Sequence, residues 1–406
     1  MRKATVIIGA NFGDEGKGLM TDYFASPGTL VVRFNGGAQA GHTVIRGDKR
    51  HVFGHFGSGT LAGAPTFLSK FFVVNPILLQ REARELEMIG IKPTLFIDDN
   101  CRVTTPFEMA LNQSIEDSRG DNKHGSCGVG LHETILRHSV IPLTVSDLYV
   151  RSRVETALYL IRHEYQDHRL KEMGANYSVK ISDYLRTASE RFMESVEFLL
   201  DTYNHPHIFP LNQFEDFIFE GAQGLLLDAN HKFFPHVTCS KTGLHNVSMI
   251  INDFFPTIGL DKLEVVYVTR CYLTRHGKGP LPHEVGMSEI LKREVDETNV
   301  ANKYQGEFRY AWLDLNLLSE TIYNDCKWMK VPRTLAITCL DQMSPGNHME
   351  GLIGYYRDNR FFYSSCGDFI IEVLSFIRLN NEHFKRGSGL SYASFGPRKE
   401  NIIHAG

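Results

Sequence analysis

A glycine-rich segment near the start of the chain holds a lysine and two carboxylates within ten residues. It reads G-A-N-F-G-D-E-G-K-G over Gly9–Gly18 and follows a short apolar run. The backbone N–H groups of such a loop, the start of a following helix and the charge of Lys17 all favour a phosphate group. Carboxylates repel phosphate unless they bind a metal or transfer protons. Asp14 and Glu15 therefore indicate metal binding or acid–base chemistry.

The segment differs from a Walker A loop. That pattern needs a glycine, four further residues and then Gly-Lys-Ser/Thr. Asn11 stands at the place of its first glycine, and Gly18 stands where the magnesium-binding hydroxyl would be. A P-loop GTPase switch is therefore disfavoured, and the plainer alternative to a phosphate site is a tight turn with solvated charges.

A second glycine-rich loop, N-G-G-A-Q-A-G-H-T over Asn35–Thr43, ends in a histidine. Because the imidazole pKa lies near neutrality, His42 is a candidate general acid. A lone histidine is more often a packed, hydrogen-bonded residue. The first loop, expected at the same edge of the sheet, favours the catalytic interpretation.

Short apolar strands must position these loops. Thr5–Gly9 and Leu30–Phe34 each run into one of the two glycine loops. The order strand, loop, helix favours a mostly parallel sheet with ligands at the carboxyl ends of its strands. Hydrophobic patterns predict further strands at 72–74, 94–97, 217–219, 264–269 and 335–338, and helices at 77–89, 154–173, 184–203 and 369–379. Glycine-rich loops recur at 125–130, 220–224, 276–279 and 394–397.

The predicted fold class is α/β, with a large, mostly parallel central β-sheet flanked by helices. No repeat, linker or break in composition divides the chain. We therefore predict that residues 1–406 form a single domain with helical insertions.

The composition excludes several classes of protein. The 406 residues are 42% hydrophobic and 22% charged, and the formal net charge of −4 gives no basic surface for nucleic acid. No run reaches the roughly 18 apolar residues of a membrane-spanning helix, and the N-terminus shows no targeting pattern. Seven scattered cysteines without a C-x-x-C pair are typical of reduced thiols. We expect a cytoplasmic protein without nucleic-acid or membrane partners.

Taken together, the motifs resemble the adenylosuccinate synthetase family. That family carries Q-W-G-D-E-G-K-G and G-G-x-N-A-G-H-T, which stand here as N-F-G-D-E-G-K-G and G-G-A-Q-A-G-H-T. Further segments of the family follow in the same order over roughly 390 residues, which is far more specific than one glycine motif. They are H-F-G-S-G (55–59), E-G-A-Q-G-L-L-L-D (220–228), P-H-V-T (235–238), T-R-H-G-K-G-P-L-P (274–282), W-L-D (312–314), T-C-L-D (338–341) and S-F-G-P (394–397).

The resemblance implies a P-loop-NTPase-like fold and a carbon–nitrogen ligase. Such an enzyme phosphorylates the 6-oxygen of a 6-oxopurine nucleotide from a nucleoside triphosphate, and L-aspartate then displaces the phosphate. It implies that Asp14 removes the proton from ring nitrogen 1, that His42 donates to the developing oxyanion and that Lys17 neutralises the transferring phosphoryl group. Mg²⁺ would be the cofactor, held by Asp14 and the carbonyl of Gly41.

The resemblance also implies a set of binding residues. Those that hold nucleotide or phosphate would be Asn11, Gly13, Glu15, Gly16, Gly18, Gln39, Ser126, Cys127, Gln223 and Thr238, with Asp341, Ser394, Gly396 and Pro397 around a guanine base of the donor. Arg137 lies where the family uses an arginine from a second subunit to grip the 5′-phosphate, which implies a homodimer.

The chain departs from the family pattern in three places. The aspartate-binding loop T-T-G-R-x-R-R-x-G-W is reduced to Gly306 and Arg309, so Arg309, or else Arg275, would bind the aspartate carboxylate. Ser126-Cys127 replaces a Thr-Thr pair. Cys339 replaces a lysine that packs on guanine, which leaves both GTP and ATP open as the donor.

These departures surround the substrates, whereas Asp14, Lys17 and His42 are intact. In this superfamily, bacteriophage 2-aminoadenylosuccinate synthetases use dGMP, and loss of an arginine near the ribose 2′-hydroxyl suits a deoxynucleotide. Our leading hypothesis is dGMP as acceptor, in the 2-aminoadenine pathway of a phage acting in host cytoplasm. IMP as acceptor is the alternative, and Asp14 favours it because some phage relatives carry Ser at that position. A non-catalytic nucleotide-binding protein is a more distant one.

Overall fold

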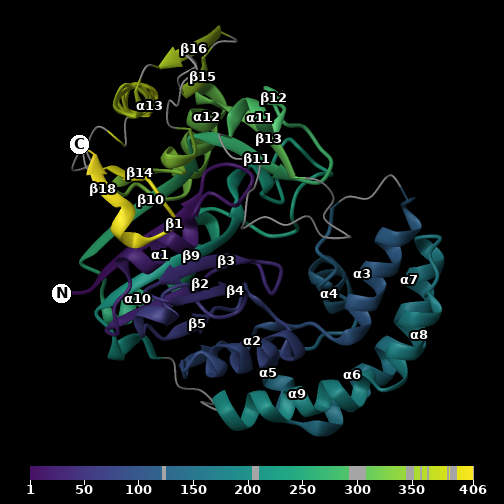
Figure 1. Ribbon diagram of the computed structural model, residues 1–406. Coiled ribbons are helices and arrows are strands. Elements are labelled where there is room, and N and C mark those ends of the chain that lie inside the picture. The colour runs from purple at the N-terminus through teal and green to yellow at the C-terminus, as the bar shows by residue number, and fades with distance from the viewer. Residues whose placement is uncertain are drawn as a thin grey trace.

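The computed structural model shows a twisted sheet from which a curved arm of helices extends (Figure 1). The structure describes residues 1–120, 125–203, 210–291, 308–343, 352–356, 359–363, 365–381, 384 and 391–405.

The central sheet holds nine strands within the described residues. Their order is β18 (Ile402–Ala405), β17 (Ser391–Ser394), β14 (Arg333–Thr338), β10 (Lys262–Arg270), β1 (Lys3–Gly9), β9 (Asp216–Gly224), β2 (Thr29–Arg33), β5 (Thr66–Leu68) and β7 (Leu95–Ile97). All neighbouring pairs are parallel except β17 with β18. The carboxyl ends of β1, β2, β9 and β14 therefore meet at one edge, where the loops can share a ligand.

Alternation along the strands builds two apolar layers, because successive side chains point to opposite faces. Val6 and Ile8 of β1 pack on one face with α10 (Leu244–Ile258), α12 (Leu315–Asp325) and α13 (Cys366–Asn380). Ile7 packs on the other face with α1 (Lys17–Phe24). The central strands are thus buried on both sides, which gives the near-continuous apolar runs seen in the sequence.

A second core lies under the helical arm, beside the β5–β7 edge of the sheet. Thr105 caps the helix that begins at Pro106, with a reciprocal capping box to Glu108. The helices of this part are α2 (Pro76–Met88), α3 (Pro106–Ser118), α4 (Leu131–His138), α5 (Val145–Leu148), α6 (Arg151–Leu160), a π-helical turn (η3, Ile161–Tyr165), α7 (Gln166–Glu172), α8 (Val179–Arg186) and α9 (Ala188–Tyr203).

Smaller elements complete the architecture. A five-stranded sheet joins β11 (Tyr272–His276), β12 (Glu284–Val285), β13 (Phe308–Asp314), β15 (Leu352–Tyr356) and β16 (Asn359–Tyr363). Two pairs stand apart: the hairpin β3 (His42–Arg46) with β4 (Lys49–Phe53), and β6 (Val73–Val74) with β8 (Arg102–Val103). Short helices are η1 (Thr60–Ala62), η4 (Pro210–Gln213), η5 (Leu225–Leu227), α11 (Met287–Ile290), η6 (Cys326–Trp328), η7 (Leu340–Met343) and η8 (Lys399–Asn401).

The predicted fold class is confirmed, with corrections in detail. The strand expected at 72–74 pairs outside the central sheet, and 220–224 continues β9 instead of forming a loop. The helix expected at 154–173 passes through the π-helical turn, and the one at 184–203 is split between α8 and α9. That residues 1–406 form a single domain stays a prediction.

Candidate active site

The first glycine loop is held together by a carboxylate folded beneath it. Oε1 of Glu15 accepts hydrogen bonds from the backbone N–H groups of Asn11 and Gly13, at 3.1 and 2.7 Å. Its Oε2 lies 2.7 Å from Nζ of Lys17, and both side chains are buried. Glu15 was expected to bind phosphate, but it shapes the loop and places the charge of Lys17 under it.

Asp14 stands at a partly exposed turn of the same loop in a left-handed conformation, with φ of 61°. Non-glycine residues seldom adopt this conformation, and such strain gathers at functional sites. The flanking Gly13 and Gly16 also have positive φ, at 98° and 95°. The carbonyl of Asp14 accepts a hydrogen bond of 2.6 Å from Nε of Arg270, and its carboxylate lies 3.5 Å from Nε2 of His276.

Hydrogen bonds fasten the second glycine loop to the end of β9. The side-chain amide of Asn35 exchanges two of them with the backbone of Ala222, at 3.0 and 2.7 Å. The N–H of Gly36 donates to Oγ of Ser240. Three segments that are distant in the sequence therefore meet beside the first loop.

His42 begins β3 and faces a buried carboxylate. Its Nδ1 lies 2.6 Å from Oε1 of Glu220, which belongs to β9. Ser58 donates to Glu220 from both its backbone N–H and its hydroxyl. Nε of the fully buried Arg33 lies 4.0 Å from Oε2 of Glu220. This arrangement fixes the ring of His42 and directs Nε2 away from Glu220, which is what a positioned acid or base needs.

The charges of this cluster follow from its surroundings. Burial raises the pKa of Glu220, but the charges of Arg33 and His42, with hydrogen bonds from His42 and Ser58, outweigh it and bring this pKa to about 2. Burial lowers the pKa of His42, and together with the charges of Arg33 and Lys17 it outweighs the raising effect of Glu220. An anionic substrate would raise the pKa of His42 again, because a nearby negative charge favours the protonated ring.

Two of the predicted nucleotide-binding residues present buried polar atoms without a hydrogen-bond partner in the described part of the chain. These atoms are Oδ1 of Asn11 and both amide atoms of Gln39. Buried polar groups are nearly always paired, so these atoms are suited to a ligand. Gln223 has a φ of 65° and approaches the first loop, since a Cβ on Gly13 would lie 3.7 Å from its Cα.

The loop at 125–130 reaches the same neighbourhood. A Cβ on Gly37 would lie 3.1 Å from Leu131, the first residue of α4. Ser126 donates from its hydroxyl to Asn112. Burial raises the pKa of the Cys127 thiol to about 11, with a smaller contribution from Cys239, the neighbour of Thr238. Cys127 and Cys239 are thus near enough to interact electrostatically, and Thr238 is the neighbour of Cys239 in the chain.

The residues predicted for the donor base follow two adjacent parallel strands. Asp341 lies in η7, after β14, and is exposed. Ser394 ends β17 and donates from its hydroxyl to the carbonyl of Gly396, next to Pro397. The hydroxyl of Thr338 donates to the carbonyl of Glu15 at 2.7 Å, which joins this segment to the first glycine loop.

The structure does not bring Arg137 to the site. Its side chain is fully buried, and its guanidinium donates to Glu108 and to the carbonyls of Val103 and Ile141. A guanidinium held in this way inside its own chain does not reach a phosphate in another subunit. We therefore remove Arg137 from the candidate phosphate ligands.

The guanidinium of Arg309 is likewise hydrogen-bonded within the chain. Its guanidinium pairs with both carboxylate oxygens of Glu284 and donates to the carbonyls of Gly277 and Gly279. Arg275 donates to the carbonyls of Pro280 and His236. Neither presents the open fork that binds a carboxylate. Gly306, the other predicted aspartate-binding residue, lies outside the described residues.

The donor set at Asp14 fits magnesium. Among the described residues, no group of three or more His, Cys, Asp or Glu side chains forms a metal cage. Mg²⁺ usually takes one or two carboxylates and completes its shell with water and substrate phosphates. The partly exposed carboxylate of Asp14 and the exposed Gly41 supply oxygen ligands of this kind.

Sequence reasoning missed the partners of the two key side chains. Glu220 opens the E-G-A-Q-G motif but was not singled out, and Arg33 is a charge inside an otherwise apolar strand. His276 and Arg270, which contact Asp14, lie in and just before the T-R-H-G-K-G-P motif. For Arg33 and Glu220, the signal available in the sequence was a charged residue within an apolar strand, which indicates a buried charge with a partner.

Comparison with known proteins agrees with this geometry. The profile of the adenylosuccinate synthetase family matches residues 6–366. An adenylosuccinate synthetase from Clostridium botulinum is 30% identical over 387 residues, covering 90% of this chain and 85% of the relative. One from Teredinibacter turnerae is 32% identical over 70% of this chain and 66% of the relative.

Two solved structures share the fold. The fully ligated adenylosuccinate synthetase from Plasmodium falciparum superposes with a TM-score of 0.72 at 19% identity, covering 99% of each chain. The succinoaminodeoxyadenylate synthetase of cyanophage S-2L, bound to dGMP and to dATP as an energy donor, gives a TM-score of 0.60 at 15% identity. That match covers 100% of this chain and 95% of the phage enzyme.

The fold and the site define a nucleotide-binding carbon–nitrogen ligase of purine biosynthesis. The chain belongs to the adenylosuccinate synthetase family, whose members bind a purine nucleotide, aspartate and a nucleoside triphosphate and are generally Mg²⁺-dependent. Within the described ranges, no helix is long and apolar enough to cross a membrane.

Proposed function

We propose that this enzyme joins L-aspartate to carbon 6 of dGMP and uses a nucleoside triphosphate to activate the 6-oxygen. The observation that carries the chemistry is the His42–Glu220 contact of 2.6 Å beside the loop that holds Asp14 and Lys17. The product is N6-succino-2-amino-2′-deoxyadenylate. Cytoplasmic location and a homodimer stay predictions.

In the first step, the carboxylate of Asp14 takes the proton from ring nitrogen 1 of the purine. Electron density moves to the 6-oxygen, which bonds to the γ-phosphorus while the bond to the leaving diphosphate breaks. The charge of Lys17 and the donor at His42 offset the negative charge that develops. His42 serves this purpose because Glu220 fixes its ring.

In the second step, the amino nitrogen of aspartate attacks carbon 6, the bond from carbon 6 to the phosphorylated oxygen breaks, and the amine loses a proton to the departing inorganic phosphate. His42 then donates to the departing phosphoryl group.

Asp14 and Gly41 would hold Mg²⁺, which supplies charge neutralisation on the triphosphate when bound. Asp341 supports GTP as the donor, and the Cys339 replacement keeps ATP as its alternative.

The preference for a deoxynucleotide is supported by Arg309. The family resemblance places an arginine of the aspartate loop near the ribose 2′-hydroxyl, but Arg309 is bound to Glu284 and to two carbonyls. An acceptor without that hydroxyl needs no such partner. The fold shared with the dGMP-bound phage enzyme over the whole chain is consistent with this acceptor.

IMP is the second candidate acceptor. The retained Asp14 favours it, since some phage relatives carry serine there, and the curated relatives carry the name adenylosuccinate synthetase. In that case the product is adenylosuccinate on the route to AMP.

The test is a turnover assay with purified enzyme, Mg²⁺, L-aspartate and either GTP or ATP. Acceptors are dGMP, GMP, IMP and dIMP, the 2′-deoxy form of IMP. Phosphate release gives the rate, and mass spectrometry identifies the succinyl nucleotide. We expect dGMP to have the highest kcat/KM. Highest kcat/KM with IMP would establish the second candidate, and no product with any acceptor would overturn the ligase function.

A separate variant tests the assigned base. Asp14→Asn keeps the size of the side chain but cannot take the proton from nitrogen 1. We expect product formation to fall by several orders of magnitude, on the scale of about 10³-fold, with unchanged folding by circular dichroism. Unchanged turnover would refute the role of Asp14.

A further inference from the structure

His42 and His276 lie on opposite sides of β1, and His276 contacts Asp14. In the central sheet, β1 lies between β9 and β10. His42 contacts Glu220 of β9, whereas His276 ends β11, which follows β10 after a single residue. The loop with Asp14 begins where β1 ends, between the strand that faces His42 and the strand that leads to His276.

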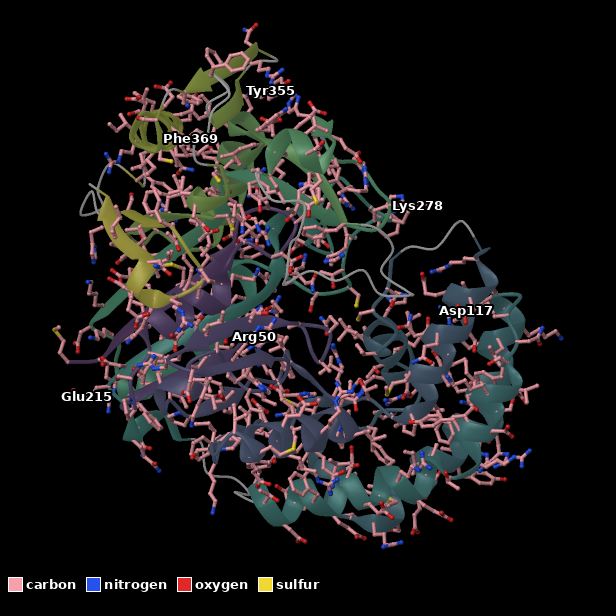
Figure 2. All side chains as sticks on the ribbon, viewed as in Figure 1. Arg50, Asp117, Glu215, Lys278, Tyr355 and Phe369 are labelled. Atoms are coloured by element: carbon pink, nitrogen blue, oxygen red, sulfur yellow. The ribbon has the colours of Figure 1, made fainter. Side chains whose placement is uncertain are left out.

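The ring of His276 is held at this position by its neighbours and remains partly exposed to solvent. Nε2 lies 3.5 Å from Oδ2 of Asp14, and the two side chains are 21% and 32% exposed. The ring packs on Phe308 of β13, with centroids 4.5 Å apart, and His276 pairs in register with Phe308. Figure 2 shows Lys278, two residues further along, on the side of the molecule that faces Asp117 of the helical arm.

The edge of a 6-oxopurine matches this order of groups. The 6-oxygen, nitrogen 1 and the substituent on carbon 2 follow one another along that edge. If His42 takes the 6-oxygen and Asp14 takes nitrogen 1, as in the proposed function on which this step rests, carbon 2 faces His276.

An amino group on carbon 2 has two N–H bonds to donate. One is directed toward Asp14, and the other points outward, where a ring nitrogen of His276 accepts it. A hydrogen atom on carbon 2, as in hypoxanthine, makes neither bond. A site built to hydrogen-bond a substrate group discriminates against the analogue that lacks the group.

We propose that His276 reads the 2-position of the acceptor and, together with Oδ2 of Asp14, selects a 2-amino-6-oxopurine nucleotide. His276 is thus a specificity-determining residue, in a position where the T-R-x-G-x-G-P motif specifies no residue type.

The test compares dGMP with dIMP, which differ only in the 2-amino group, in the wild-type enzyme and in His276→Leu. The ratio of kcat/KM for dGMP to kcat/KM for dIMP is expected to fall about fivefold to tenfold in the variant, as for the loss of one hydrogen bond. We expect a smaller loss for dIMP than for dGMP, because dIMP makes no hydrogen bond through carbon 2. His276→Gln, which keeps an acceptor, restores part of the ratio.

A second histidine provides the control. Nε2 of His283 lies 3.3 Å from Oδ2 of Asp314, with exposures of 20% and 14%. Its ring stacks on Tyr355 at a centroid distance of 3.8 Å. Because His283 has a φ of 59°, Asn is the suitable substitution. His283→Asn is expected to leave the dGMP to dIMP ratio unchanged.

Two results would overturn the proposal. An equal loss for dGMP and dIMP in His276→Leu would mean that His276 only positions Asp14, and a rise in the ratio would mean that it excludes the amine. The ratio of Kd values for the two nucleotides, measured by calorimetry, tests His276 without turnover. A wild-type enzyme that binds dGMP more tightly but forms no product would therefore refute the proposed function and not the selectivity of His276.

Discussion

Glu220 in the middle of β9 and Asp325 at the end of α12 are two buried carboxylates in different surroundings. Glu220 faces Arg33, His42 and Ser58, and its pKa falls to about 2. Asp325 accepts from the backbone N–H of Leu244 and from the hydroxyl of Tyr267, at 2.8 and 2.9 Å. Burial raises its pKa to about 6, against the lowering effect of these two hydrogen bonds.

The difference lies in the partners, because both groups are withdrawn from water. A nearby cation stabilises the charged carboxylate, whereas neutral donors only partly replace the lost hydration. Glu220 is therefore kept ionised where it can orient His42. Asp325 instead accepts a hydrogen bond from the first backbone N–H of α10, and it leaves no room for a side chain at residue 243, where a Cβ would lie 2.0 Å from its Oδ1.

The largest expected effect is on catalysis. Glu220→Gln removes the charge that fixes His42, so we expect turnover to fall about 10²- to 10⁴-fold, while the KM for the acceptor changes little. Steady-state kinetics measure this loss. Asp325→Asn is the control and is expected to stay within about twofold of wild type. Equal losses in the two variants would contradict the comparison.

The second effect is on stability. Glu220→Gln leaves Arg33 buried without its carboxylate, so we expect a loss of about 3–5 kcal/mol at neutral pH. The pKa of Glu220 is depressed from 4.5 to about 2. Its contribution is therefore complete above pH 4.5 and is lost as the pH falls toward 2. Urea unfolding at several pH values should show that the difference in free energy of unfolding between wild type and Glu220→Gln becomes smaller below pH 4.5. A difference that becomes larger there would contradict the prediction.

Asp325→Asn should behave in the opposite way. Because the pKa of Asp325 is raised from 3.8 to about 6, its contribution is most favourable below pH 3.8 and is lost as the pH rises through 6. The variant is expected to be more stable than wild type by about 1–3 kcal/mol above pH 6, with no advantage below pH 3.8. Thermal unfolding across this range checks it. A destabilised variant at high pH would show that the ionised group is well solvated.

The smallest effect is expected from Tyr267→Phe. This variant removes one hydrogen bond to Asp325, which costs about 1 kcal/mol, and leaves turnover unchanged. It also raises the pKa of Asp325 further, so the loss grows as the pH increases. Unfolding curves at two pH values distinguish this from a uniform loss of packing.

Much of the fold was accessible from the sequence because the pattern is local. The apolar runs at Thr5–Gly9 and Leu30–Phe34 form β1 and β2, and each leads into its glycine loop. The three-residue strand β5, between β2 and β7, was missed because so short a run has no readable period.

The candidate site was accessible only in part. Asp14, Lys17 and His42 were singled out by their loops, but Glu220 lies 178 residues from His42, and no local pattern pairs them. Arg137 and Arg309 occupy suggestive positions in the sequence, yet their guanidinium groups are bound within the chain. A residue type shows which bonds a side chain can form, and it does not show which are already taken.

The sequence by itself determined the class of chemistry, because phosphate loops and acid–base side chains require particular residues at particular spacings. The tertiary structure decided which charges are available. Parallel pairing of β1 with β9 and β10 brings Glu220 to His42 and His276 to Asp14. Buried charges depend on neighbours within a few ångströms, and those neighbours come from strands that only folding places side by side.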